Sequence, residues 1–450
     1  MSSPSLVAAA LALWQDRMRS DSSSDGSSSE SSSSSEDDDD DHEMQVLAQA
    51  HQQLTAQVTL LRALVNQRKM HSPVYQDDEV NAATADSIGG HDGLVGDQGD
   101  PVAEFLRDSD DATFYDMFRM QRSSFTALLE RVASKMDLTG AQTTFSGSTV
   151  SPGIALLLFL FHCVHRSSYE ELSETFGIAP AVSCSLLIRQ VAIAVAALEL
   201  IKLPTSENEV RALADANEAL SGVPQCVLSI GGTHCPIEKP AYYADAYLNA
   251  KGYYSTVLHA AVDHKLRFRE IVAGWPGGLA NSRVFASSSL RLSCKDWLKQ
   301  FPAKLVPTMD KDNESLPMFL LGDAAYDSDE HLVTMYNDSD RENGPVRLAL
   351  SVLHSYVTQA FTLLRRRFGV LLAPLATKAD GFSAIPPLLF ALCSLHNFLE
   401  DRGDSYDGLN DGDEDLRAFE LSFPAPEQES SNEDNGGYST RRVLEKYLLR

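Results

Sequence analysis

Asp323 is the residue in this 450-residue sequence that is best placed to act as a catalytic carboxylate. It follows the apolar run Met318–Leu321 and one glycine, a pattern that predicts a short buried strand with an acid at its end. A second run, Cys226–Ile230, also closes on glycine, but there Gly231 and then His234 follow. Hard cations such as Mg²⁺ need several oxygen ligands, so Asp323 alone cannot assemble a two-metal site.

Five short motifs accompany these two strands. They are Gly231-Gly232-Thr233-His234, Tyr247–Ser255, Gly274-Trp275-Pro276-Gly277-Gly278, Gly322-Asp323-Ala324-Ala325-Tyr326 and Leu395-His396-Asn397. In this order and spacing they resemble the catalytic domain of PIF/Harbinger DNA transposases and the cellular proteins derived from them. The resemblance covers roughly residues 105–403. It implies an RNase H-like α/β core, a mixed sheet of three antiparallel and further parallel strands flanked by helices, after an N-terminal helical domain.

The resemblance also implies where a catalytic site would lie. The family uses three metal-binding carboxylates, and their positions here are Gly231, Asp323 and Thr358, so that two of the three are replaced. No acid occurs in residues 219–237 or 343–379, so a shift in alignment would not restore either one. Asn281 stands where the family often has a further Asp.

Two other side chains could contribute to a metal site. Asp263 follows the second strand, which should run antiparallel to the first, so we expect it to point away from the site in a structural role; the alternative is a weak site shared with Asp323. His234 is a poor replacement for a bridging carboxylate with Mg²⁺. If a metal binds, we expect Mg²⁺ or Mn²⁺ at Asp323, in a weak, vestigial site.

The net charge of −26 is unevenly distributed. Residues 1–110 carry −15 and residues 400–450 carry −8, which leaves −3 for the core. A DNA-cleaving core normally presents a basic track to phosphates, and this one has no basic excess. We expect the dense cluster Arg365–Arg367 to form a partner-binding or salt-bridged surface, and direct DNA binding to be weak or absent.

The cysteines and the hydropathy pattern indicate the type of cellular compartment. Six cysteines without CxxC pairs indicate buried free thiols in a reducing environment. The sequence has no run of about eighteen apolar residues, so we expect a soluble intracellular protein with no membrane association.

Composition, together with what the motif resemblance implies, divides the chain into six parts. We expect a disordered Ser/Asp-rich acidic segment (1–43), an amphipathic or coiled-coil helix (44–69), a linker (70–103), a helical domain (104–200), the RNase H-like Harbinger DDE domain (222–403), and an acidic tail with a short terminal helix (404–450). The heptad pattern in 44–65 predicts either self-association or docking on the chain's own core.

The helical domain contains a helix–turn–helix pattern across residues 167–197. In its second helix only Arg189 and Gln190 could read base edges, which favours a structural module over a DNA reader.

Harbinger elements encode a separate Myb/SANT-like DNA-binding protein that associates with the transposase, so the resemblance implies a partner. Our hypothesis is a domesticated Harbinger transposase-like protein without nuclease activity, a nuclear interaction component with a Myb/SANT-like or chromatin-associated partner. The location is then the nucleus, with the cytoplasm as a further compartment. The alternative is a metal-dependent DDE endonuclease whose site is non-standard or completed by a partner.

Overall fold

The computed structural model describes residues 110–449, apart from 137, 139–142, 145–149, 180–181, 311, 337–343, 377–381, 405, 407–413 and 426–437. The acidic segment 1–43, the helix predicted for 44–69 and the linker 70–103 therefore lie outside the described residues, and those expectations stay predictions.

The first part of the described chain is helical. It comprises α4 (Asp111–Phe118), α5 (Arg122–Val132), α6 (Pro152–His165), α7 (Tyr169–Phe176) and α8 (Val182–Ala196), with short strands β1 (Thr143–Thr144) and β2 (Ile178–Ala179) that pair with each other. Ser168 and Glu171 form a capping box that starts α7. Gly177 ends it at φ 63°, a left-handed conformation that glycine adopts without strain.

Helices α7 and α8 take the places predicted for the helix–turn–helix. Helix α8 packs against α6 and α14, and most of its side chains are buried, among them Leu187, Val191 and Val195. Arg189 is exposed, whereas the Oε1 atom of Gln190 is buried. Because most of the α8 surface packs inside the fold, little of it could contact a DNA groove. This supports the interpretation of the helix–turn–helix pattern as a structural module.

The central sheet is mixed, as predicted. Its strands lie in the order β5-β4-β3-β8-β9, with β3 Cys226–Pro236, β4 Ser255–Val262, β5 Phe268–Pro276, β8 Phe319–Gly322 and β9 Leu332–Thr334. Strands β3, β4 and β5 pair antiparallel, while β8 and β9 add parallel to β3. This mixed α/β architecture is consistent with a DDE or RNase H-like domain.

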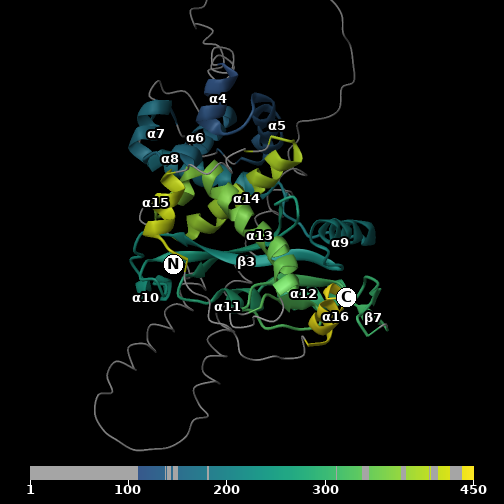
Figure 1. Ribbon diagram of the computed structural model, residues 1–450. Helices are drawn as coiled ribbons and strands as arrows, with labels where there is room; N and C mark the ends of the chain where they lie inside the picture. The colour runs from purple at the N-terminus through teal and green to yellow at the C-terminus, as the bar shows by residue number, and fades with distance from the viewer. Residues whose placement is uncertain are drawn as a thin grey trace, which may run out of the picture. The chain divides into compact units, whose positions relative to one another are not determined.

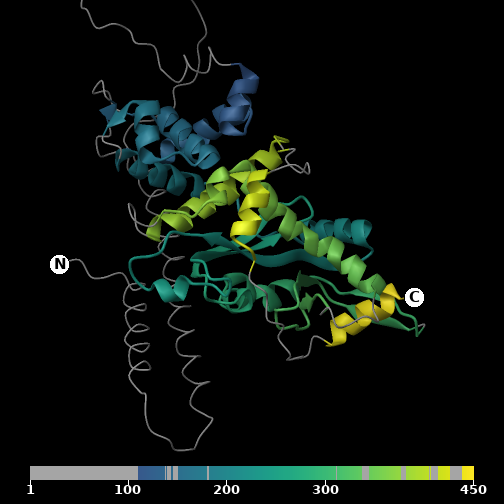
Figure 2. The same cartoon turned by 60° about the vertical axis from the view of Figure 1, so that its left-hand side comes forward.

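Helices cover both faces of the sheet, with α13 and α14 on one side and α11 and α12 on the other (Figures 1 and 2). The remaining bounds are α9 Glu207–Ser221, α10 Ala244–Tyr247, α11 Asn281–Ala286, α12 Ser289–Leu298, α13 Gly344–Arg367, α14 Ile385–Asp401, and the hairpin β6 Lys304–Pro307 with β7 Asn313–Leu316. One buried apolar cluster joins α9, α11 and α12 to the sheet through residues such as Val210, Leu228, Ile230, Phe285, Leu290 and Leu320.

The Leu395-His396-Asn397 motif is a structural clamp between α14 and the edge strand β5. The buried Asn397 amide accepts a hydrogen bond from the Phe268 N–H (2.8 Å) and donates to the Phe268 carbonyl (2.7 Å) and the Leu200 carbonyl (3.1 Å). His396 Nε2 lies 2.8 Å from the Leu266 carbonyl. These bonds satisfy backbone groups that burial would otherwise leave unpaired.

We expected the acidic C-terminal tail to be disordered apart from its short terminal helix, and that prediction is wrong for Glu414–Ser422, which is helical. Helices α15 (Glu414–Ser422) and α16 (Tyr438–Leu448) form because apolar side chains recur at helical spacing within the acidic composition. Helix α16 buries Val443 and Leu444, and its Lys446 ammonium contacts Glu314 at 2.7 Å. The terminal helix that we expected is therefore present and docks on the chain's own β6–β7 hairpin.

Among the described residues one helical stretch, Phe382–Asp401, is long and apolar enough to cross a membrane by length and composition. Of its most apolar window, 72% is buried inside the fold, as in the core helix of a globular domain. All six cysteines are free and buried, as predicted.

Candidate functional site

Strand β3 carries Gly231 in its middle, not at its end as the sequence suggested, because pairing with β4 continues to Pro236. The parallel register pairs Ser229 with Leu321. Two residues further along, this register brings Gly231 level with Asp323, just where β8 has ended. Strand β8 therefore does not cover the edge of β3 beside Gly231, whereas β4 pairs with the other edge there.

Helix α13 lies directly over this part of β3. The Ser229 hydroxyl donates to the Leu353 carbonyl at 2.7 Å. One step along the same strand face, a Cβ atom on Gly231 would lie 3.1 and 3.3 Å from the two γ carbons of Val357. Val357 thus fills the space that a side chain at Gly231 would need, and the adjacent Thr358 enters the same site.

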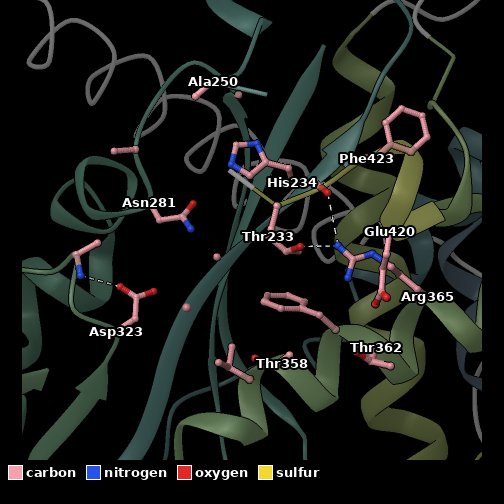
Figure 3. Close-up of a pocket in the computed structure, with 18 of the residues that line it drawn as sticks. Thr233, His234, Ala250, Asn281, Asp323, Thr358, Thr362, Arg365, Glu420 and Phe423 are labelled. Carbon is pink, nitrogen blue, oxygen red and sulfur yellow. Dashed lines mark hydrogen bonds between the residues drawn. The ribbon is translucent and has the colours of Figure 1, made fainter. Parts of the chain in front are cut away.

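A cavity of about 510 Å³ opens at this point. Gly231, Asp323 and Thr358 all line it, so the structure brings together the three positions singled out from the sequence. Figure 3 shows Asp323 and Asn281 on one wall and Arg365 with Glu420 on the opposite one.

Asp323 occupies the turn after β8, where its Oδ1 atom accepts a hydrogen bond from the Ala325 N–H at 3.0 Å. His354, one turn of α13 before Thr358, also lines the cavity. Burial lowers the pKa of His354, and the Asp323 carboxylate acts in the opposite direction. The His354 Nε2 atom is buried and makes no hydrogen bond to the described residues.

His234 and Arg365 form the second wall. The Nδ1 atom of His234 lies 2.9 Å from the Ser255 hydroxyl, and burial together with the nearby Arg365 lowers the pKa of His234 to about 4. The Arg365 guanidinium donates to the Thr233 hydroxyl and, at 3.5 Å, to the His234 carbonyl (Figure 3). A neutral imidazole and a cation therefore occupy the side of the site opposite Asp323.

We expected the Arg365–Arg367 cluster to form a partner-binding or salt-bridged surface, and the ion pair of Arg367 with Glu400 favours the second alternative, although Arg367 is buried. Arg365 faces the cavity, and Arg367 is 1% exposed. Arg367 donates to the Asp404 carbonyl at 2.9 Å and to Glu400 at 3.5 Å. The helix periodicity turns consecutive arginines in different directions, so Arg365 and Arg367 meet different partners inside the fold.

Asn281, at the start of α11, packs closely against Gly232. A Cβ atom on Gly232 would lie 2.5 Å from its Oδ1 atom, so only glycine admits this approach. The Oδ1 atom is buried and has no hydrogen-bond partner among the described residues.

Asp263 lies outside the cavity and is held by arginines, as expected of a structural residue. Its buried carboxylate contacts Arg269 Nε at 2.7 Å and Arg267 at 2.9 Å, and accepts the Lys265 N–H at 2.9 Å. Burial alone would raise the pKa of Asp263, but attraction to Arg269 and Arg267 prevails and lowers it.

The residues at the cavity do not match the donors that a pair of Mg²⁺ ions requires. Asp323 and Glu420 are the carboxylates among the described lining residues, and Glu420 lies on the opposite wall beside Arg365 (Figure 3). The described part of the chain brings no three His, Cys, Asp or Glu side chains together in a metal-binding group. Gly231 offers no ligand, and Thr358 offers a neutral hydroxyl.

Sequence reasoning missed His354 as a lining residue and missed that Arg365 faces the cavity. Both lie on the helix that carries Thr358, four residues before it and seven after it. Helical periodicity places such positions on one face, so that signal was present in the sequence.

Comparison with known proteins supports the relationship inferred from the motifs. Residues 230–397 match the family model described as "DDE superfamily endonuclease". The chain is 24% identical over 310 residues to Protein ALP1-like of Arabidopsis thaliana, covering 66% of this chain and 72% of that protein. It is 23% identical over 308 residues to the Arabidopsis thaliana protein Antagonist of Like Heterochromatin Protein 1, covering 66% and 74%. No solved structure matches the chain significantly.

Residues 230–397 are therefore similar to DDE superfamily endonuclease domains. The predicted relationship to Harbinger transposase-derived proteins is confirmed.

Proposed function

We propose that this protein is a domesticated Harbinger transposase with an RNase H-like core that has lost nuclease activity and acts as a nuclear protein-interaction component. The observation that carries the proposal is the packing at Gly231. The strand position level with Asp323 has no side chain, and Val357 fills the space beside it. The position level with Asp323 therefore supplies no carboxylate, and a side chain there would crowd Val357.

The electrostatics of the cavity support the same proposal. Two-metal phosphodiester cleavage requires clustered carboxylates to hold two cations. Here the wall facing Asp323 presents the Arg365 guanidinium, which would repel a bound cation. The endonuclease alternative would need ligands from a partner chain, and no feature of the described residues favours it.

The nuclear location and a Myb/SANT-like or chromatin-associated partner are part of the proposal. The name of one relative refers to antagonism of a heterochromatin protein, which supports a chromatin setting for this chain. Proteins that co-purify with the full-length chain from nuclear extract provide the test, and a set without DNA-binding or chromatin proteins would contradict this part.

Titration calorimetry tests the loss of the metal site. We expect no Mg²⁺ or Mn²⁺ binding with a dissociation constant below about 1 mM, because one carboxylate cannot offset the cost of dehydrating the ion. Any weak signal should disappear in Asp323→Ala and persist in Asp327→Ala, an exposed acid four residues away. Two tight sites in the wild-type protein would contradict the proposal.

A further inference from the structure

Helix α15 and the residues that follow it cover one side of the cavity. Phe419, Glu420, Phe423 and Ala425 line the cavity, although they lie more than fifty residues beyond α13 in sequence. Phe419 is 6% exposed, whereas Leu421 on the opposite side of the helix is 84% exposed. The helix therefore presents one aromatic face to the cavity.

Phe419, Glu420 and Phe423 each meet a specific partner. The Arg365 guanidinium lies over the Phe419 ring, 5.1 Å from its centroid, and the neighbouring Glu420 carboxylate acts on the same cation. The Tyr253 ring contacts the Phe423 ring edge-on with centroids 5.2 Å apart. The Tyr253 hydroxyl also donates to the Pro424 carbonyl at 3.2 Å. We call the surface formed by Tyr253, Phe361, Thr362 and Arg365 the α15 groove.

The docked helix α15 buries Leu416 and Phe419 against the rest of the fold. Its nine residues are too short to form a stable helix in isolation, so its conformation depends on docking. The ion pair between Asp415 and Arg166, at 3.9 Å between largely exposed groups, adds little. A short helix that depends on docking in this way can be displaced by a segment that offers the same kinds of side chain.

We propose that the α15 groove docks an amphipathic helical segment of a partner protein, and that α15 competes for the same surface. The partner segment carries two aromatic side chains four residues apart with a carboxylate directly after the first, as in Phe419-Glu420-Leu421-Ser422-Phe423. This proposal identifies the surface that would carry out the proposed interaction function. It rests on that function only because it takes the cavity to be a binding site.

Because α15 is joined to the groove by the chain, its competition with a free segment can be estimated. A segment joined to its groove acts at an effective concentration on the order of 1 mM. A free segment that binds the open groove with a dissociation constant of about 10 µM would then bind the wild-type protein roughly 100-fold more weakly. Release of α15 should therefore raise the affinity for a free segment strongly.

Fluorescence anisotropy with a labelled peptide of residues 414–425 tests the proposal on the full-length chain. We expect Phe419→Ala with Phe423→Ala in the chain to bind this peptide at least 10-fold more tightly than wild type. Glu420→Lys, a change at an exposed position, provides a second way to release α15. Leu421→Ala should leave the weak wild-type binding unchanged, because that side chain faces solvent.

Two further measurements test the specificity of the α15 groove for the peptide. Adding Arg365→Ala to the release variant should weaken peptide binding at least 10-fold, and a peptide with both phenylalanines replaced by alanine should not bind. Equal binding to wild type and both release variants, or binding of the alanine peptide, would overturn the proposal. DNA cleavage by the same preparations would instead refute the proposed loss of catalysis and leave the groove result unaffected.

Discussion

Gly231→Asp should lower the free energy of unfolding of the full-length protein by about 2–4 kcal/mol, even though it restores a family residue. The new Cβ atom would lie 3.1 Å from a γ carbon of Val357, closer than an ordinary contact, so the Val357 side chain must give way slightly. The new carboxylate would also enter a partly buried site beside Asp323, and like charges raise each other's pKa. Denaturant unfolding monitored by circular dichroism measures the loss.

Two variants separate packing from charge in this prediction. Gly344→Asp is the matched control, because no atom lies within 4 Å of its Cβ position and an acid at a helix start is favourable. Val357→Ala removes the γ carbons, so its combination with Gly231→Asp should cost at least 1 kcal/mol less than the sum of the single changes. Strict additivity would mean that Val357 does not fill this space.

Restoring Thr358→Glu as well should not produce a nuclease. The double variant would place three acids at one site, but Arg365 remains on the facing wall and α15 still lies across the cavity. The core also carries little positive charge to hold phosphates. Efficient cleavage by the full-length double variant would show that those two substitutions alone removed catalysis.

Asp263→Ala should destabilise the protein by about 3–5 kcal/mol, because it leaves Arg267 and Arg269 without their shared buried counter-charge. Asp401→Ala is the matched control: it removes an exposed partner of the same Arg267, at 3.0 Å, and should cost less than about 1 kcal/mol. Equal losses in the two variants would contradict the structural role of Asp263.

The effect of Asp263 should depend on pH in a defined direction. Its pKa in the folded protein lies below the ordinary value for an aspartate, because attraction to Arg269 and Arg267 exceeds the cost of burial. Its stabilising contribution is therefore complete above that value and is lost as pH falls through the folded pKa. The difference between wild type and Asp263→Ala should be constant from about pH 8 to pH 5 and shrink in stronger acid.

Much of the sheet could be predicted from the sequence. The runs Cys226–Ile230 and Met318–Leu321 predicted two strands, and the motif resemblance supplied the mixed sheet of antiparallel and parallel strands. The extension of β3 to Pro236 was missed because Gly231 and Gly232 looked like a strand end. In the fold they lie inside the strand, where the side chains of Val357 and Asn281 approach the two glycines closely.

The site was predicted only in part, for a physical reason. Gly231, Asp323 and Thr358 meet as expected, because strand ends and a crossing helix converge there. The cover provided by α15 could not be predicted from composition, since Phe419 and Phe423 lie in an acidic stretch whose average properties resemble a solvated tail. Local spacing of a few aromatic residues, not average composition, decides whether such a segment docks.

Plasmid nicking by the full-length wild-type protein, with Mg²⁺ and separately with Mn²⁺, tests the central claim most directly. We expect the same conversion of supercoiled DNA for the wild-type protein, for Asp323→Ala and for buffer, because one carboxylate opposite Arg365 cannot hold two metal ions. Metal-dependent cleavage that Asp323→Ala abolishes would contradict the account and show that this cavity is an active nuclease site.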